Sequence, residues 1–205
     1  MRVFSYVVAK DSGFAPNPFH GSCTLACCKP RIRGKAKEGD LIAGLSPRCE
    51  RVVYMGRVSK VLDIAGYWHA KEFRSKRAKW TSARILDRVG DNIYEPGVGG
   101  GYTQSPSVHW DHENGMANER LMRADTGPNA ILSMTDFVYF GGEGPPLPLD
   151  LEFIEVKRGH RCNFSKEEVA LVEEFFGTLP RGVQGRPSLW SDSDMSWRQS
   201  SCASC

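Results

Sequence analysis

The fold is decided by two neighbouring runs rich in β-branched and aromatic residues, Leu41-Ile42-Ala43-Gly44-Leu45 and Arg51-Val52-Val53-Tyr54-Met55-Gly56-Arg57-Val58-Ser59-Lys60-Val61-Leu62. The turn Glu38-Gly39-Asp40 precedes the first run. Both runs predict strands, and Gly56 inside the second predicts a bulge or a bend. Two strands after a turn, with a glycine at a corner, are typical of a small, strongly bent β-barrel.

Further elements surround this strand pair. Residues 3–9, 131–140 and 151–156 predict additional strands, and residues 67–89 carry helical material. Ser165-Lys166-Glu167-Glu168 is a capping box that opens a helix ending at Phe176, with Gly177 closing it. The sequence therefore predicts an α+β fold, in which a small bent barrel carries a helical insertion and a C-terminal helix.

The chain length predicts one domain with an appendage. It has 205 residues, of which 40% are hydrophobic and 25% charged, enough to bury a core. We expect residues 1–177 to form the domain and residues 178–205 to form a flexible tail, because the tail is rich in Ser, Gly and Arg. Trp190 and Trp197 in this tail offer a docking segment for a protein partner.

Composition also bears on location and cofactors. No apolar run reaches the roughly 18 residues that span a bilayer, and the first residues lack a signal-peptide pattern, so we expect a soluble, cytoplasmic protein with no membrane contact. Seven cysteines is an odd number that argues against a disulfide framework. His20, Cys23 and Cys27 could supply three metal ligands, but a fourth is missing, so we expect no metal and no cofactor.

The charge is unevenly distributed along the chain. Residues 1–90 hold 18 Lys and Arg against 7 Asp and Glu, whereas residues 91–205 hold 9 against 17. A basic first half favours an anionic partner, and nucleic acid is the commonest one. Packing of the two halves against each other would also neutralise this asymmetry, and both interpretations stay open.

Aromatic and basic residues alternate in the first half. Phe14, Phe19 and His20 precede Lys29, Arg31 and Arg33 by about one short element. Stacking surfaces beside cations are what an unstacked base requires, and the amide of Asn17 could read the edge of such a base. The alternative is that both phenylalanines are core residues that fix a proline-rich loop.

Three more groups offer parts of a site. Gly90-Asp91-Asn92-Ile93-Tyr94 is either a simple turn or a polar pocket contact. His109 and His112 could bind a metal or move protons, or could lie on a surface loop. Cys23, Cys27 or Cys28 could act as a nucleophile with His20, because nearby cations favour a thiolate.

Several runs of this sequence are similar to those of a known family, the second of the nucleotide-modification-associated domain families. These runs are Tyr6-Val7-Val8-Ala9-Lys10-Asp11, Gly13-Phe14-Ala15-Pro16-Asn17-Pro18-Phe19, Cys23-Thr24-Leu25-Ala26-Cys27-Cys28-Lys29-Pro30-Arg31-Ile32-Arg33, Gly90-Asp91-Asn92-Ile93-Tyr94 and Asp136-Phe137-Val138-Tyr139-Phe140-Gly141. The resemblance covers roughly residues 1–150. It implies a role near modified nucleotides in phages or bacteria.

A second resemblance concerns the fold alone. The order of a strand, a basic segment, Gly39-Asp40 and the strand through Tyr54-Met55-Gly56-Arg57-Val58 is similar to the opening of PUA-like barrels. This resemblance, which extends to EVE-like relatives, implies recognition of a modified base in an aromatic pocket.

Together these features predict a protein that binds DNA or a nucleotide through a modified base. We expect Lys29, Arg31 and Arg33 to hold phosphate, Phe19 and Tyr94 to stack on the base, and Asn17, Asp91 and Asn92 to read its edge. The alternative is an enzyme, a transferase or hydrolase, that acts on a nucleotide or DNA base. Its candidate catalytic residues are His20, Cys27, Asp91 and His109.

Overall fold

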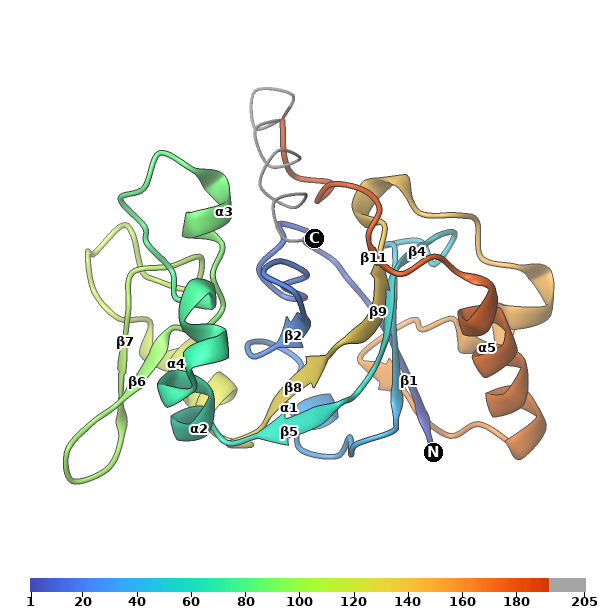
Figure 1. The fold of residues 1–205 in the computed structure, drawn as a ribbon, viewed down its shortest axis with the longest axis horizontal. Coiled ribbons are helices and arrows are strands. Elements are labelled where there is room, and N and C mark those ends of the chain that lie inside the picture. The colour runs from blue at the N-terminus through green and yellow to red at the C-terminus, as the bar shows by residue number, and fades with distance from the viewer. Residues whose placement is uncertain (192–205) are drawn as a thin grey trace.

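The computed structural model describes residues 1–191 and shows a mixed α+β fold around a six-stranded sheet (Figure 1). In spatial order its strands are β10 (His160–Arg161), β1 (Val3–Val7), β3 (Leu41–Leu45), β4 (Val52–Arg57), β9 (Asp136–Tyr139) and β11 (Gly182–Val183). Strand β1 runs parallel to β3 and β9 runs parallel to β11, whereas the other neighbours are antiparallel. All five residues of β3 are buried, which places this predicted strand at the centre of the molecule.

A break after β4 links this sheet to a second one, and Gly56, where a bulge or bend was predicted, pairs in regular register with Ile42 and Phe137. Beyond β4 the chain continues into β5 (Lys60–Leu62), and β8 (Ile131–Met134) leads into β9, so the paired strands pass together into a three-stranded sheet, β2 (Cys23–Leu25)-β8-β5. At the crossing the Ser59 and Thr135 hydroxyls lie 2.9 Å apart. The long strand predicted for residues 51–62 is therefore two strands that belong to different sheets.

The α+β class is confirmed, but the two sheets do not close into a barrel within residues 1–191. The large sheet instead ends in two short edge strands, β10 and β11. A closed barrel is thus not confirmed, and the resemblance to PUA-like proteins stays a prediction.

One face of the large sheet is covered by α5 (Lys166–Thr178) and the 3₁₀ helix η3 (Leu149–Ile154). The predicted capping box of α5 is confirmed, although the helix continues past Gly177 to Thr178. The strand predicted for residues 151–156 is wrong, because this segment is largely η3. Pro148 precedes η3, and Leu151 and Ile154 are spaced three residues apart and both buried, which suits one face of a 3₁₀ helix.

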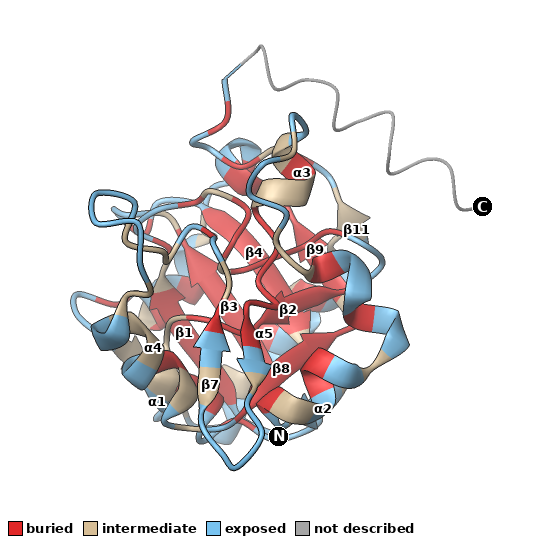
Figure 2. Ribbon diagram, turned by 90° about the vertical axis from the view of Figure 1, so that its left-hand side faces the viewer, coloured by how far each residue is buried: buried red, intermediate tan, exposed pale blue. Residues whose placement is uncertain are grey.

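The segment between β5 and β8 forms a separate lobe beside the sheets (Figure 1). It contains α2 (Ile64–His69), the 3₁₀ helix η1 (Lys71–Lys76), α3 (Ile85–Arg88), the hairpin β6 (Tyr94–Pro96)–β7 (Tyr102–Gln104) and α4 (Glu119–Thr126). The helical material predicted for residues 67–89 is present as the short helices α2, η1 and α3. Figure 2 looks onto this side, where exposed helices and the hairpin lie over buried strands. None of the described helices has the length and apolar character to span a bilayer.

Residues 179–191, which their composition places in the tail, pack against the rest of the molecule. Strand β11 pairs with β9, and Trp190 is buried against Phe19 with ring centroids 5.3 Å apart. The buried Asp11 carboxylate accepts hydrogen bonds from the Tyr139 hydroxyl and the Ser188 amide. Trp197 and the Cys202-Ala-Ser-Cys205 motif lie outside the described residues.

Gly44 of β3 is expected to be required where it pairs with Tyr54 of β4. A Cβ atom at this position would lie 2.4 Å from Cε1 of Tyr54 and 2.8 Å from Cγ2 of Val8, so Gly44→Ala overpacks the core and should cost about 1–3 kcal/mol of unfolding free energy. Urea unfolding measures this loss.

The matched control is Gly177→Ala in α5, where a Cβ atom meets nothing within 4 Å. This change should be neutral or should stabilise by up to about 1 kcal/mol, because alanine favours the helix. Equal effects of the two substitutions would contradict the packing described for Gly44.

Candidate active site

A cysteine, a histidine and an aspartate form a continuous chain of contacts at the boundary between the sheets and the inserted lobe. Sγ of Cys28 lies 3.4 Å from Nε2 of His109, and Nδ1 of the same ring lies 2.8 Å from Oδ2 of Asp125. We call these three residues the thiol centre. A nucleophile, a base and a group that orients the base stand in this order in enzymes that use covalent catalysis.

Cys28 sits on an unusual turn between β2 and the short helix α1 (Pro30–Arg33). Its φ is 60° and that of Lys29 is 46°, a left-handed conformation that residues other than glycine seldom adopt. The turn is held at both backbone groups of Cys28, whose amide donates to Oδ1 of Asp125 at 2.7 Å and whose carbonyl accepts from Nε of Arg33 at 2.7 Å. These bonds fix the direction of the thiol.

Asp125 comes from α4, which Asn118 caps at its N-terminus. It is the buried residue of this helix, with 2% exposure. Besides the Cys28 amide and the His109 ring, its carboxylate accepts a hydrogen bond of 2.8 Å from the Tyr94 hydroxyl. Because the carboxylate bonds three segments of the chain, it is immobilised.

His109 is positioned by the loop that follows β7. Its carbonyl accepts a hydrogen bond of 3.1 Å from the Gln104 side chain, which in turn accepts from the Asn118 amide. The ring packs on Phe14 with centroids 4.7 Å apart. The imidazole side chain keeps 12% exposure, so the centre is not sealed from solvent.

The surroundings set the charge of the imidazole. Burial by itself lowers the pKa of His109, but its hydrogen bonds to Asp125 and Cys28 outweigh burial and raise that pKa from 6.5 to about 9. Burial pushes the pKa of Asp125 upwards, yet the hydrogen bond from His109 and the further contacts with Tyr94 and Arg33 hold it below its usual value. At neutral pH an imidazolium therefore faces the Cys28 thiol.

The polar residues predicted to read a base come together, but inside the protein. Asp91 accepts 2.6 Å hydrogen bonds from the Thr24 and Tyr67 hydroxyls. Asn17 donates to the Val89 carbonyl, and Asn92 donates to the carbonyls of Tyr67 and Phe73. Asn17, Asp91 and Asn92 are at most 2% exposed, so a ligand could reach them only if these bonds opened.

Lys76 is the cation of this buried network. Its ammonium donates to Oδ1 and the carbonyl of Asn17 and to the carbonyl of Ser22, at 2.8–3.1 Å. Burial lowers the pKa of Lys76 from 10.5 to about 8, although Asp91 opposes the shift. Gly90 is needed beside it, because a Cβ atom there would lie 2.3 Å from the Lys76 carbonyl oxygen. The Gly90–Tyr94 motif thus packs against η1 within the inserted lobe, and Asp91 joins the lobe to Thr24 of β2.

The remaining predicted binding residues lie in different surroundings. Phe19 is buried against Trp190, and Tyr94 is buried with its hydroxyl on Asp125. Arg33 is buried, with its guanidinium on three carbonyls. Lys29 covers the Tyr6 ring and donates to the Val7 carbonyl, while Arg31 is exposed.

The predicted catalytic candidates separate in the same way. His109 belongs to the thiol centre, whereas His20 is exposed beside Lys60 and Glu72 in another pocket. Cys27 is fully buried, its thiol donates to the Asp91 carbonyl, and burial raises its pKa well above the ordinary range.

Sequence reasoning paired Cys28 with His20 rather than with His109, and it did not identify Asp125. A signal for Asp125 was present in α4. Leu121 and Met122 precede it by four and three residues, so the carboxylate lies on the apolar face of this helix. A charged group at such a position indicates a buried partner, but not which one.

Cys27, His109 and Asp125 could also hold a metal ion, since their ligand atoms lie within 4.8 Å of one another. Thiolate, imidazole and carboxylate together suit a zinc-like ion. Binding would require Cys27 to lose its proton and its hydrogen bond to Asp91. The predicted group of His20, Cys23 and Cys27 does not form a ligand cluster within residues 1–191.

These features define an α+β protein with a buried polar framework and an accessible thiol centre. The chain belongs to the nucleotide modification associated domain 2 family, whose model matches residues 1–194. The resemblance found in the sequence is thereby confirmed and extends beyond residue 150. No curated protein and no solved structure matches the chain significantly.

His109 is expected to make the stability of the protein depend on pH. The unfolded histidine releases its proton near pH 6.5 and the folded one near pH 9, so the folded state binds more protons between these values. The unfolding free energy should therefore fall as pH rises from 6.5, by up to about 1.4 kcal/mol per pH unit. Urea unfolding at several pH values measures this slope, with this protein and its control both carrying Cys28→Ser so that no thiol at this position exchanges a proton.

The control is His109→Gln, which should lose this part of the pH dependence. The comparison is best made between pH 6.5 and 8, because Lys76, with its pKa lowered to about 8, adds stability at higher pH and so acts with the opposite sign. Parallel curves for the two proteins would contradict the raised pKa of His109.

Proposed function

We propose that this protein is a cysteine-dependent enzyme of nucleotide or DNA-base modification, with Cys28 as its nucleophile. The observation that carries the proposal is the alignment of Cys28, His109 and Asp125 through contacts of 3.4 and 2.8 Å. The reaction class it fits best is acyl transfer or hydrolysis of an amide or ester group carried by a nucleotide. This develops the enzyme alternative, with His109 kept and Cys28 in place of Cys27.

The geometry assigns one task to each residue. The Cys28 thiolate attacks the acyl carbon, and the sulfur–carbon bond forms while the bond to the leaving group breaks. His109 gives its Nε2 proton to that leaving group. Water or an amine then attacks the thioester, its proton passes to Nε2, and the Cys28 thiolate is released. Asp125 stays ionised and holds the ring through Nδ1.

The nucleotide character of the substrate is supported by the family and by charge. The family model concerns nucleotide modification, and the first half of the chain carries the excess of Lys and Arg. We infer a place in a DNA-modification or defence system of phages or bacteria, in line with the family resemblance.

Binding of a modified base without chemistry is a second candidate function. It is favoured by a cationic surface, because Lys35, Arg31 and Lys29 lie close enough to His160 to help lower the pKa of that histidine, after the effect of its burial. Arg31 is exposed there and could hold phosphate. The PUA-like resemblance of the strand pair favours this reading by fold analogy.

The two functions differ in what is recovered after incubation with base-modified DNA. An enzyme leaves an altered base, and Cys28→Ser abolishes the change, whereas a reader returns the DNA intact with or without Cys28. Mass spectrometry of the digested DNA distinguishes these outcomes.

Cys28 is expected to be the fastest thiol to react with iodoacetamide at pH 7. His109→Ala should slow its alkylation by about tenfold or more, because the imidazolium that favours the thiolate is lost. Asp125→Asn should slow it as well, since the ring loses its orienting partner. Peptide mapping by mass spectrometry measures the rate at each cysteine.

Cys162 provides an internal reference, because it is also half-buried and its thiol lies near Asn163 rather than a histidine. Its alkylation rate should be the same in all variants. If Cys28 in His109→Ala reacts at the wild-type rate while Cys162 is unchanged, the thiol centre is not an activated nucleophile and the proposal fails.

A further inference from the structure

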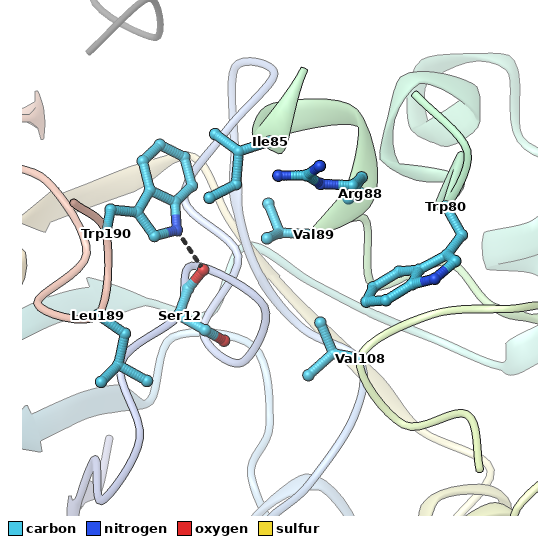
Figure 3. A pocket seen from close by; sticks show the side chains of 8 residues that line it. All are labelled: Ser12, Trp80, Ile85, Arg88, Val89, Val108, Leu189 and Trp190. Carbon is cyan, nitrogen blue, oxygen red and sulfur yellow. Dashed lines mark hydrogen bonds between the residues drawn. The ribbon is translucent and has the colours of Figure 1, made fainter. Parts of the chain in front are cut away.

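A pocket of about 370 Å³ opens beside α3, with Trp80 and Trp190 on opposite sides of it (Figure 3). Its size lies within the roughly 300–1,000 Å³ of small-molecule sites. Ile85, Val89 and Val108 supply an apolar lining, and the Arg88 guanidinium lies between the two indoles. None of the residues that predicted a base site in the sequence lines this pocket.

Both indole walls are held in place. Trp190 donates from Nε1 to the Ser12 carbonyl at 2.8 Å and stacks on Phe19 with an interplanar angle of 20°. Trp80 stacks on His112 with centroids 4.3 Å apart and keeps 38% exposure. Because His112 covers one face of Trp80, the exposed part of the ring is available to a ligand in the pocket.

Arg88 adds a charge that suits an anionic ligand. It is half-buried, and no acceptor or carboxylate within residues 1–191 pairs with its guanidinium. Lys79 is exposed on the same segment and adds positive charge near the pocket. A guanidinium beside aromatic rings is the combination that binds phosphate next to a stacked base.

We propose that this pocket binds one nucleoside phosphate unit, with the base against Trp80 and the phosphate on Arg88. The inference rests on the proposed function only in taking the ligand to be a nucleotide. The unit could come from a free nucleotide or from a single strand, because both present the same base and phosphate. A duplex would have to release a base first.

Two loops contact both the pocket and the thiol centre. Val108 lines the pocket and the next residue, His109, belongs to the centre. Ser12 lines the pocket, and Phe14, two residues further, packs on the His109 ring. A nucleotide held by Trp80 and Arg88 would thus contact the loop that carries His109, and on the proposed function the pocket is a substrate subsite.

The test is calorimetric titration of the full chain with deoxyadenosine 5′-monophosphate, deoxyadenosine and a short oligodeoxyadenylate. Trp80→Ala should weaken all three ligands by about tenfold or more, because base stacking is lost. Arg88→Gln should weaken the two ligands that carry phosphate and leave deoxyadenosine unchanged. Arg74→Gln, which removes an exposed charge outside the pocket, should bind like wild type.

The outcomes separate the subsite from the chemistry. If only the affinity for the oligodeoxyadenylate falls in the Trp80 and Arg88 variants, the subsite is supported and its ligand is a unit of a single strand. If the affinity for the monophosphate falls as well, the ligand is a free nucleotide. Wild-type affinity in both variants, or no binding of any ligand, overturns the inference. Cys28→Ser should bind these ligands with wild-type affinity, because Cys28 does not line the pocket. If Cys28 of the wild type shows no enhanced alkylation while the ligands still bind, the proposed enzyme is refuted and the subsite stands.

Discussion

The structure depends on one carboxylate. Asp125 accepts hydrogen bonds from the Cys28 amide, the Tyr94 hydroxyl and the His109 ring, so it joins the turn after β2, strand β6 and the loop after β7 to helix α4. A buried ionised carboxylate is costly unless its oxygens are fully hydrogen-bonded. The need to satisfy Asp125 therefore fixes the relative positions of these four segments, and the same bonds orient the candidate base and nucleophile.

Two buried cations continue this constraint on either side of the centre. Arg33 donates to the carbonyls of Cys28, Ala130 and Asp125, which holds the turn of Cys28 against both the end of α4 and the start of β8. Lys76 donates to the carbonyls of Asn17 and Ser22, which joins η1 of the lobe to the segment before β2. Such groups contribute little net stability, but each is costly to leave unpaired. They therefore select one arrangement of lobe and sheets, as the proposed enzyme would require.

Much of the fold could be predicted, because local signals and tertiary packing agree in β1, β3 and α5. They disagree in residues 151–156, where an apolar run suggests a strand but Pro148 and three-residue spacing give η3. Among site residues, His109 could be predicted as a reactive type. Asp125 could not be paired with it, because they meet only through α4 and a long loop. Asn17, Asp91 and Asn92 carry the right groups for reading a base, yet their partners are within the protein.

The shared loops would make the proposed nucleotide binding and the proposed chemistry interdependent. The segment 107–112 presents Val108 to the pocket, His109 to Cys28 and His112 to Trp80. A ligand that stacks on Trp80 would press this ring against His112, on which it is stacked. Nε2 of His112 lies 2.9 Å from the Ser107 carbonyl oxygen at the start of the same loop. Because Asp125 and Phe14 hold His109 from the other side, ligand contacts would restrict the loop further rather than displace it. Filling the pocket should thus sharpen the alignment of imidazole and thiol, which is how binding energy improves the positioning of a catalytic group.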